Sequence, residues 1–380
     1  MDKIIYLDNA SKTIPYNEVV EKYNEVTTSY FANPASIHTL GNRANRLLEK
    51  TKEEMLSLFK LNNHQVIFTS SATESNNLAI KGYALKYQNR GKHLIVSSYE
   101  HPSVLEAVKQ LEDNFGFEIS YIEPDSSGVI SVQKVEESIR KDTILVSIMA
   151  VNNEIGSINP IEEIANLLAK YPKIVFHVDA CQAVGKMKQE INYKNVDMFT
   201  ISAHKVGGII GTAALIKKKN LELLPLLSGG GQEYGLRSST VNLAGSVAFL
   251  ESLKISLKKD KEHYDAVSIL ANHFLDGLKE MEDYFELNTP SEINPYIINF
   301  SSKNKKSSVI VEALGNAGIM VSSTSACHSS KQKGSYVVKA IGKSDNIANN
   351  TIRVSFAYTN TIEEVDALLL NLKKIVGEIR

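Results

Sequence analysis

Short apolar segments alternate with amphipathic helical segments through most of the first 250 residues, and this alternation restricts the fold more than any other feature of the chain. The predicted strands are 65–69, 93–97, 143–148, 173–178 and 198–201, and the helical segments between them are 74–88, 104–114, 132–141 and 161–171. Because nearly continuous apolar strands need cover on both faces, the pattern predicts an α/β fold with a mainly parallel sheet between helices. Ligands of such sheets bind at the carboxyl ends of the strands.

The pattern changes after the glycine cluster at 228–231. Long helical segments follow at 243–259 and 263–281, then shorter strands at 296–300 and 351–356, and a closing helix at 362–379. We expect a large domain at 15–250 and a smaller α+β domain formed by 1–14 and 251–380.

Charge and cysteine content exclude several classes of protein. The 380 residues carry 42 basic and 43 acidic side chains, for a net charge of −1, so no direct contact with nucleic acid is expected. No stretch approaches the roughly 20 apolar residues of a membrane span, and the first residues lack a signal-peptide pattern. Two cysteines rule out a disulfide framework and fit a reducing compartment. We expect a soluble cytoplasmic protein without a metal site.

Lys205 and Asp179 are the most informative polar pair. Asp179 follows the strand at 173–178, and Lys205 comes 26 positions later (205 − 179). An enzyme that uses pyridoxal phosphate needs a lysine amine for a Schiff base and a carboxylate that keeps the pyridinium nitrogen protonated. Ser202 and His204 precede Lys205 and are predicted to reach the phosphate. The alternative is an ordinary strand that ends at an aspartate and is followed by a surface lysine.

Two further motifs follow strands directly. Ala72 and Thr73 begin a predicted helix, whose exposed N–H groups and the Thr73 hydroxyl favour a phosphate. Taken alone, the motif favours the alternative, a plain capping box from Ser71 to Glu74. His101 is predicted to stack on a flat cofactor ring and to move protons; the alternative is a simple turn before a helix that begins with proline.

Three more polar positions extend this set. Asn153, within the loop at 152–156, is predicted to contact a phenolic oxygen or a substrate carboxylate, although polar loops of this composition are common. Gln182 lies close to Asp179 in the chain and is placed to donate to a ring oxygen. Arg237 follows the glycine cluster as a candidate anion clamp.

The two cysteines occupy different surroundings. Cys327 lies in a Ser/Lys/Gly-rich run with His328 and Lys331 nearby, which indicates an exposed thiol whose thiolate form is favoured. Cys181 lies among small apolar residues and is predicted to be inert packing.

The order of these motifs resembles the cysteine desulfurases among the class V, fold-type I pyridoxal phosphate enzymes. The matching segments begin at 6–10, 33–38, 72–77, 100–101, 152–156 and 177–182, and continue at 202–205, 230–240, 325–327 and 352–355. The resemblance covers almost the whole chain and implies a seven-stranded, mainly parallel sheet in the large domain.

The resemblance also implies roles for individual residues. Lys205 carries the cofactor, His101 stacks on its ring, Asp179 pairs with its nitrogen and Gln182 binds its phenolic oxygen. The phosphate ligands it implies are Thr73, Ser202, His204 and, from the second subunit of a homodimer, Thr240. Asn153 and Arg353 hold the carboxylate of L-cysteine.

Cys327 takes the sulfur as a persulfide in this resemblance and passes it to an acceptor protein. The nine positions from Cys327 to Tyr336 (336 − 327) are similar to the long loop of the bacterial housekeeping and nitrogen-fixation-type desulfurases, here at about 322–335. The acceptor classes implied are an iron–sulfur scaffold, a tRNA thiolation enzyme, or another pathway for sulfur-containing cofactors.

The chain departs from the family pattern where Ser71, Ser239 and Thr324 replace glycines and where 206–211 replaces a Gly-Pro-Lys turn. A lost glycine matters where the backbone requires a positive φ. Two other interpretations stay open. One is a related class V activity, namely selenocysteine lyase, cysteine sulfinate desulfinase or aminotransferase; the other is a catalytically silent scaffold.

Overall fold

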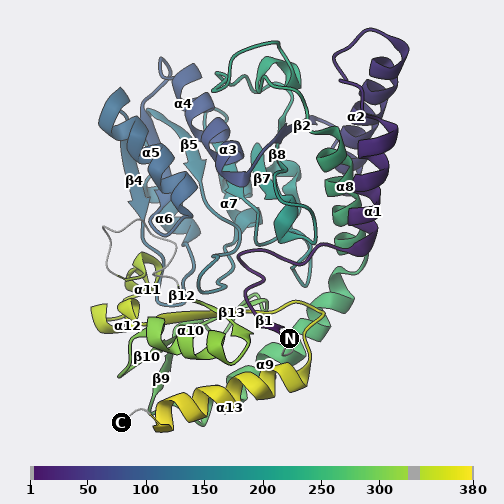
Figure 1. The fold of residues 1–380 in the computed structure, drawn as a ribbon. Coiled ribbons are helices and arrows are strands. Elements are labelled where there is room, and N and C mark those ends of the chain that lie inside the picture. The colour runs from purple at the N-terminus through teal and green to yellow at the C-terminus, as the bar shows by residue number, and fades with distance from the viewer. Residues whose placement is uncertain (1–3, 324–333, 379–380) are drawn as a thin grey trace.

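The computed structural model describes residues 4–323 and 334–378, and the segment that carries Cys327 lies outside these residues. A large sheet with its helices forms the upper part of the molecule in Figure 1, and a smaller sheet with its helices forms the lower part. None of the helices within the described residues is long and apolar enough to cross a membrane.

The upper sheet has seven strands in the order β2-β8-β7-β6-β5-β3-β4. In chain order they are β2 His64–Thr69, β3 His93–Ser97, β4 Glu118–Ile122, β5 Thr143–Ser147, β6 Val175–Asp179, β7 Met198–Ser202 and β8 Ala213–Lys218. Neighbouring strands pair in parallel, except that β8 is antiparallel to both β2 and β7. The predicted α/β class and mainly parallel seven-stranded sheet are therefore confirmed.

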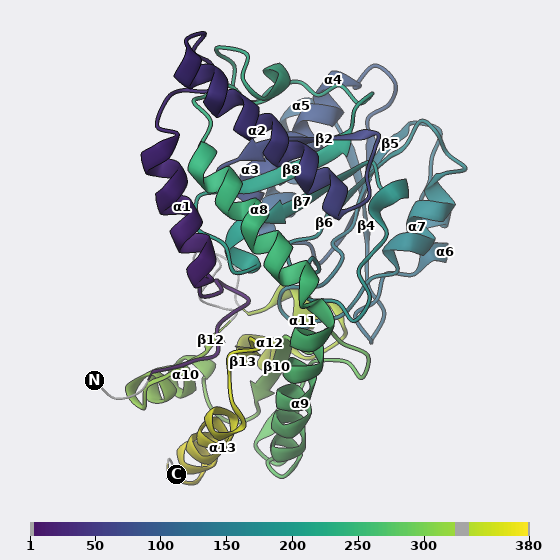
Figure 2. The same ribbon diagram turned by 90° about the vertical axis from the view of Figure 1, so that its right-hand side faces the viewer.

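Alternate residues of the strands enter different apolar cores. In β2, Val66 and Phe68 belong to the core on one face, and Ile67 belongs to the core on the other face. Figure 2 shows α1, α2 and α8 together over the first face. The helices packed in this first core are α1 Asn17–Ser29, α2 Thr39–Leu58, α6 Val132–Glu137, α7 Ile161–Leu168 and α8 Leu243–Lys258. This two-sided burial explains the nearly continuous apolar strands of the sequence.

The other face of the sheet is covered by the chain between β2 and β4. This cover consists of α3 Ala72–Asn77, the π-helical turn η1 Leu78–Gly82, α4 Tyr83–Lys86 and α5 Pro102–Phe115. The single helix predicted at 74–88 is thus three short helical pieces, because the middle turn takes the wider π form.

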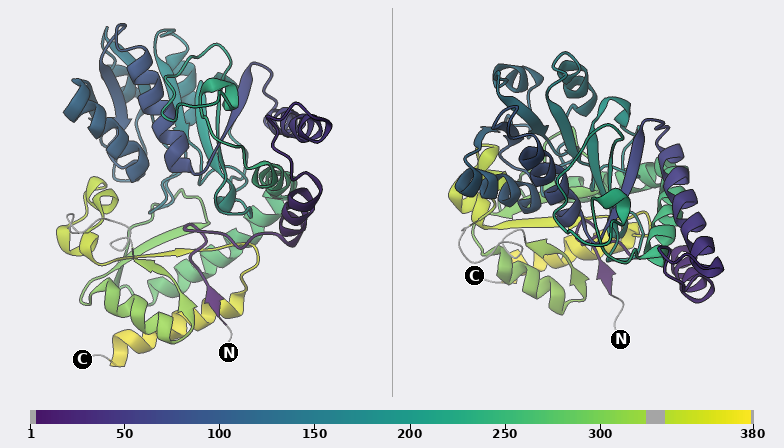
Figure 3. Two further views of the ribbon diagram at one scale, coloured as in Figure 1. Left: turned by 45° about the horizontal axis from the view of Figure 1, so that its top comes forward. Right: turned by 90° about the horizontal axis from the view of Figure 1, so that it is seen from above.

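The lower part contains a four-stranded sheet in the order β12-β13-β10-β9, seen below the large sheet in the left view of Figure 3. Its strands are β9 Phe285–Leu287, β10 Ile297–Ser302, β12 Ser322–Ser323 and β13 Thr351–Ser355. The short strands β1 Ile5–Tyr6 and β11 Ile319–Met320 pair in parallel beside it. This pairing brings the first residues of the chain to its last third.

Three long helices and two short ones complete this part of the chain. They are α9 Asp260–Lys279, α10 Ser307–Asn316, α11 Tyr336–Ala340, α12 Asp345–Asn349 and α13 Ile362–Glu378. The helices α9, α10 and α13 pack with the small sheet in a core of their own, whereas Val337 and Ile347 of α11 and α12 belong to the first core of the large sheet. The predicted division at about residue 250 stays a prediction.

Candidate active site

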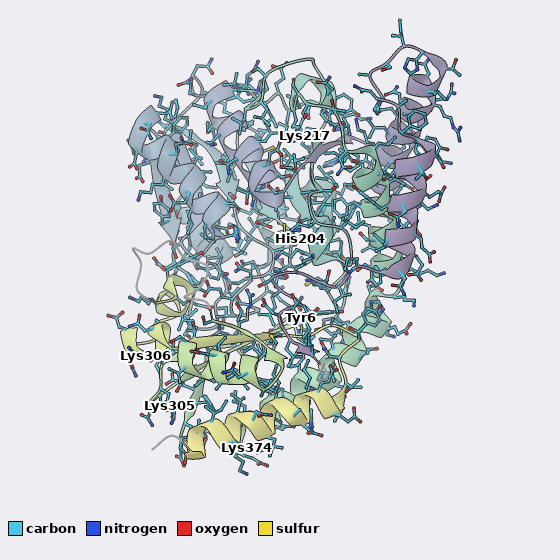
Figure 4. The ribbon with its side chains drawn as sticks, viewed as in Figure 1. Tyr6, His204, Lys217, Lys305, Lys306 and Lys374 are labelled. Carbon is cyan, nitrogen blue, oxygen red and sulfur yellow. The ribbon has the colours of Figure 1, made fainter. Side chains whose placement is uncertain are left out.

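The carboxyl ends of neighbouring strands open on one cavity of about 310 Å³ between the large and small sheets. Figure 4 shows His204, one of its lining residues, between the two parts of the molecule. The sequence-predicted residues that line the cavity are Ala72, Thr73, His101, Asn153, Asp179, Gln182, His204, Lys205 and Arg353. Ser202 is buried behind this wall, Thr240 is exposed elsewhere on the chain, and Cys327 lies outside the described residues.

Asp179 is the last residue of β6, and its carboxylate is held by two hydrogen bonds. Oδ2 accepts from Nδ2 of Asn76 at 2.8 Å, and Oδ1 accepts from the backbone N–H of Cys181 at 3.0 Å. The residue is 6% exposed. A carboxylate fixed in this way is a directed acceptor for a cationic N–H group.

Lys205 ends the short turn that follows β7. Its Nζ donates to the carbonyl oxygens of Ala10 at 2.6 Å and Ser11 at 2.7 Å. Burial, and after it the positive charge of Arg353, lower the pKa of Lys205 to about 8. The amine is consequently closer to its neutral, nucleophilic form at physiological pH than an exposed lysine.

His101 caps α5 and lines the cavity at the same time. Its Nδ1 accepts from the backbone N–H of Ser103 at 3.1 Å and lies 2.8 Å from the Ser103 hydroxyl. Pro102 is the first helical residue. The capping turn considered as an alternative is therefore what orients this ring toward the cavity.

The start of α3 also combines a cap with a position on the cavity wall. Ser71 accepts from the backbone N–H of Glu74 at 3.2 Å, while Ala72 and Thr73 line the cavity. The Ser71 φ is −162°, extended backbone that needs no glycine, so this departure from the family pattern carries no backbone strain. Arg237 pairs with Glu74 at 2.7 Å and does not line the cavity, in contrast to the anion clamp predicted there.

Arg353, from β13, faces the strand ends from the small sheet. Its guanidinium donates to Asp8 Oδ1 at 2.9 Å, to the Ser11 hydroxyl at 2.7 Å and to the carbonyl of Asn153 at 3.0 Å. Among the described residues, Nε of Arg353 and Oδ1 of Asn153 are buried without a hydrogen-bond partner. Buried polar atoms are normally satisfied, so these two mark a place for ligand atoms.

Gln182 and His204 complete the wall around Lys205. The Gln182 side chain donates from Nε2 to the carbonyl of Ala10 at 2.9 Å. His204 Nδ1 lies 2.9 Å from the Ser202 hydroxyl, and burial together with the charge of Lys205 lowers the His204 pKa to about 4. A neutral imidazole at this position keeps hydrogen-bonding capacity for a ligand without adding charge.

Two buried carboxylic acids belong to this region: Glu154 lines the cavity, and Glu100 lies behind its wall. Glu100 accepts from the backbone N–H of Met149 at 2.6 Å and from Ser97, and burial raises its pKa to about 8. Glu154 accepts from the Ser335 hydroxyl, and burial raises its pKa to about 7.

Several contributors have no role in the sequence-based prediction. Asn76 holds Asp179, Asp8 holds Arg353, and Lys186 donates to Oε1 of Gln182 at 3.1 Å. Two features of the sequence could have pointed to these residues. Asp8 lies in one of the matching segments, and Lys186 comes four positions after Gln182.

Comparison with known proteins identifies the class. The sequence profile of the class V aminotransferases matches residues 5–368, and the chain belongs to this family. The predicted cofactor is confirmed by this membership, because the family depends on pyridoxal phosphate.

Individual relatives span nearly the full chain. A NifS/IcsS protein homolog of Lactobacillus delbrueckii subsp. bulgaricus is 39% identical, with coverage of 98% of this chain and 97% of the relative. Cysteine desulfurase IscS of Vibrio vulnificus is 39% identical, with coverage of 99% and 93%. The solved structure of a NifS-like protein superposes with a TM-score of 0.91 at 32% identity, covering 99% of this chain and all of that one.

The residues present suit pyridoxal phosphate. The cavity offers a fixed carboxylate acceptor in Asp179 and an amine of lowered pKa in Lys205, on its two neighbouring strand ends. It also offers helix N–H groups at Ala72 and Thr73. These three groups match a protonated ring nitrogen, an aldehyde carbon and a phosphate group, respectively.

Proposed function

We propose that this chain is a cysteine desulfurase that removes sulfur from L-cysteine, releases L-alanine and keeps the sulfur as a persulfide on Cys327. The observation that carries the proposal is the convergence of Lys205, Asp179 and Arg353 on a single cavity. The relatives named cysteine desulfurase, at 38–39% identity over nearly the whole chain, support it.

When bound, pyridoxal phosphate supplies an electron sink that stabilises negative charge on the substrate's α carbon. In the proposal, Asp179 accepts a hydrogen bond from the ring nitrogen, His101 stacks on the ring and Gln182 donates to the phenolic oxygen. The proposed ligands of the cofactor phosphate are Ala72, Thr73, Ser202, His204 and, in a homodimer, Thr240 of the partner subunit.

In the proposal, the substrate carboxylate accepts from Nε of Arg353, a buried atom without a partner among the described residues, and from the side-chain NH₂ of Asn153. Lys205 holds the covalent attachment in the resting enzyme and moves a proton at the α carbon once its amine is released. Its lowered pKa suits both tasks, because proton transfer is most efficient when the pKa lies near the working pH.

Cys327 then attacks the substrate sulfur as a thiolate. A sulfur–sulfur bond forms, the carbon–sulfur bond breaks, and its electron pair stays with the substrate carbon, which is protonated to give alanine. The persulfide passes by thiol exchange to an acceptor protein, proposed to be an iron–sulfur scaffold or a tRNA thiolation enzyme in the cytoplasm.

The test is the formation of alanine from L-cysteine, and the release of sulfide when a dithiol is added to reduce the persulfide, by the protein supplied with pyridoxal phosphate, with Cys327→Ser as the comparison. We expect both products from the wild type and neither from the variant. Equal product formation by both proteins would instead indicate a lyase that needs no thiol.

A further inference from the structure

Lys186 is a buried lysine without a counter-ion. It is 5% exposed, and none of the carboxylates in the described part of the chain forms an ion pair with it. Its Nζ donates to Oε1 of Gln182 at 3.1 Å. Burying an uncompensated ammonium is costly, so this lysine stands out among the groups for which the proposed reaction has no role.

The groups that face Lys186 come from several elements. Lys205 and Arg353 add positive charge and, after burial, lower the Lys186 pKa to about 7, while Cys181 acts in the opposite direction. The ring centroid of Tyr296 lies 6.0 Å from Nζ. The neighbourhood is therefore electropositive on the side of the active site.

Lys186 also lines a second cavity, of about 310 Å³, on the other side of Lys205. Lys205 lines both cavities, and Gln182 lines only the first. The remaining titratable groups around the second cavity are Tyr16, Glu18, His263, Tyr296 and Tyr358. Lys186 thus stands directly behind the wall that carries Gln182.

The hydrogen bonds of Gln182 have only one consistent orientation. Below its pKa of about 7, the Lys186 amine is an ammonium, which donates and cannot accept, so the amide oxygen of Gln182 faces it. The amide nitrogen then faces the carbonyl of Ala10 at 2.9 Å, which also accepts from Lys205 at 2.6 Å. The Ala10 carbonyl, which can only accept, and Lys186 therefore select the same orientation of the Gln182 amide from its two ends.

We propose that Lys186 is a positioning residue of the cofactor pocket, which fixes the Gln182 amide with its NH₂ group toward the cavity and places a positive charge behind it. The inference rests on the proposed function, since it concerns the donor assigned to the phenolic oxygen. A fixed donor and a nearby cation both favour negative charge on that oxygen.

The test compares Lys186→Met with Lys217→Met. Lys217 is a matched control because it is also buried (1% exposed), and within the described part of the chain it donates only to the backbone carbonyls of Lys218 and Leu221. Figure 4 shows Lys217 in the upper part of the molecule, above His204. The readouts are the dissociation constant of pyridoxal phosphate and the pH midpoint of its visible absorbance change when bound.

For Lys186→Met we expect cofactor affinity to fall about tenfold and the midpoint to rise by about one pH unit, because a nearby positive charge is lost. Lys217→Met should change neither value, even where its melting temperature falls. In a Gln182→Ala background, adding Lys186→Met should weaken affinity by less than about threefold, since the lysine acts through the amide. Should Lys186→Met fail to fold, Lys186→Gln gives the same midpoint comparison.

The inference is overturned when Lys186→Met matches the wild type in both readouts, or when its effect on affinity is undiminished in the Gln182→Ala background. A wild type that binds no pyridoxal phosphate or forms no alanine rejects the proposed function instead. A wild type that does both, beside an unaltered Lys186→Met, rejects only the role of Lys186.

Discussion

The two sides of the candidate active site are built differently. The cofactor side consists of Asp179, Lys205 and His101, which follow strands of one sheet and whose polar atoms already have protein partners. The carboxylate side consists of Arg353 with Asn153 and Asp8, and the Asp8–Arg353 contact joins residues 345 positions apart. Here two buried polar atoms have no partner among the described residues. The protein thus preorganises the polar groups of one side, whereas on the other side two polar atoms are left for a ligand to pair with.

The largest effect is expected on the cofactor side. Lys205→Ala should lower the rate of alanine formation by a factor of about 10³ or more, because both covalent attachment and proton transfer are lost. Cofactor should still bind without a covalent bond, through Asp179 and its neighbours, when measured by equilibrium dialysis. Activity near the wild-type level would show that the preorganised amine is not the reacting group.

The next effect separates the two sides directly. Arg353→Lys should reduce kcat/KM for L-cysteine by about a hundredfold, mostly through KM, because a lysine cannot reproduce the planar guanidinium contacts. Cofactor affinity should stay within about threefold of the wild type. A loss of cofactor affinity as large as the loss in kcat/KM would break the distinction between the sides.

A smaller effect is expected for the support of Asp179. Asn76→Ala removes the 2.8 Å hydrogen bond to Oδ2 and should lower kcat about tenfold, since the carboxylate is then free to rotate. Asn77→Ala is the matched control, because Asn77 donates to the carbonyls of Thr73 and Ser103 and not to Asp179. Equal losses in both variants would mean that helix α3, and not Asp179, carries the effect.

The smallest effect concerns Glu100, whose Oε2 is buried without a partner among the described residues. Its folded-state pKa of about 8 exceeds the ordinary 4.5, so the native state binds the proton more tightly than the unfolded chain. That stabilisation is complete below about pH 4.5 and is lost as the pH rises toward 8. The melting temperature of Glu100→Gln, measured relative to that of the wild type, should therefore rise by about 2–4 °C as the pH is raised from 5.5 to 8. A constant difference across this range would contradict the raised pKa.

Much of the large sheet follows from the sequence, because β3, β5, β6 and β7 are fully buried and mostly apolar. Two strands gave no clear signal. β4 is a half-exposed edge strand in which Glu118 and Tyr121 are exposed, and β8 runs antiparallel to its neighbours β2 and β7. Neither an edge position nor strand direction is encoded in local periodicity.

The same distinction holds for the site. Asp179, His101 and Lys205 were predictable because each lies at the carboxyl end of a strand or within four residues of it, which places it at a known edge of the sheet. Asn76, Asp8 and Lys186 were not, because their contacts depend on packing between distant segments or on the orientation of one amide. The Arg237–Glu74 pair likewise required the folded chain, since 163 positions separate the two residues.

The pairing of Arg353 with Asp8 and Ser11 has a consequence for biosynthesis. A ribosome releases the chain from its first residue, so Asp179, His101 and Lys205 emerge well before β13 is made. N-terminal units fold first during translation. The nascent protein thus completes the strand ends that carry Asp179, His101 and Lys205 first, and the contacts of Arg353 form only when β13 reaches the segment that holds Asp8 and Ser11.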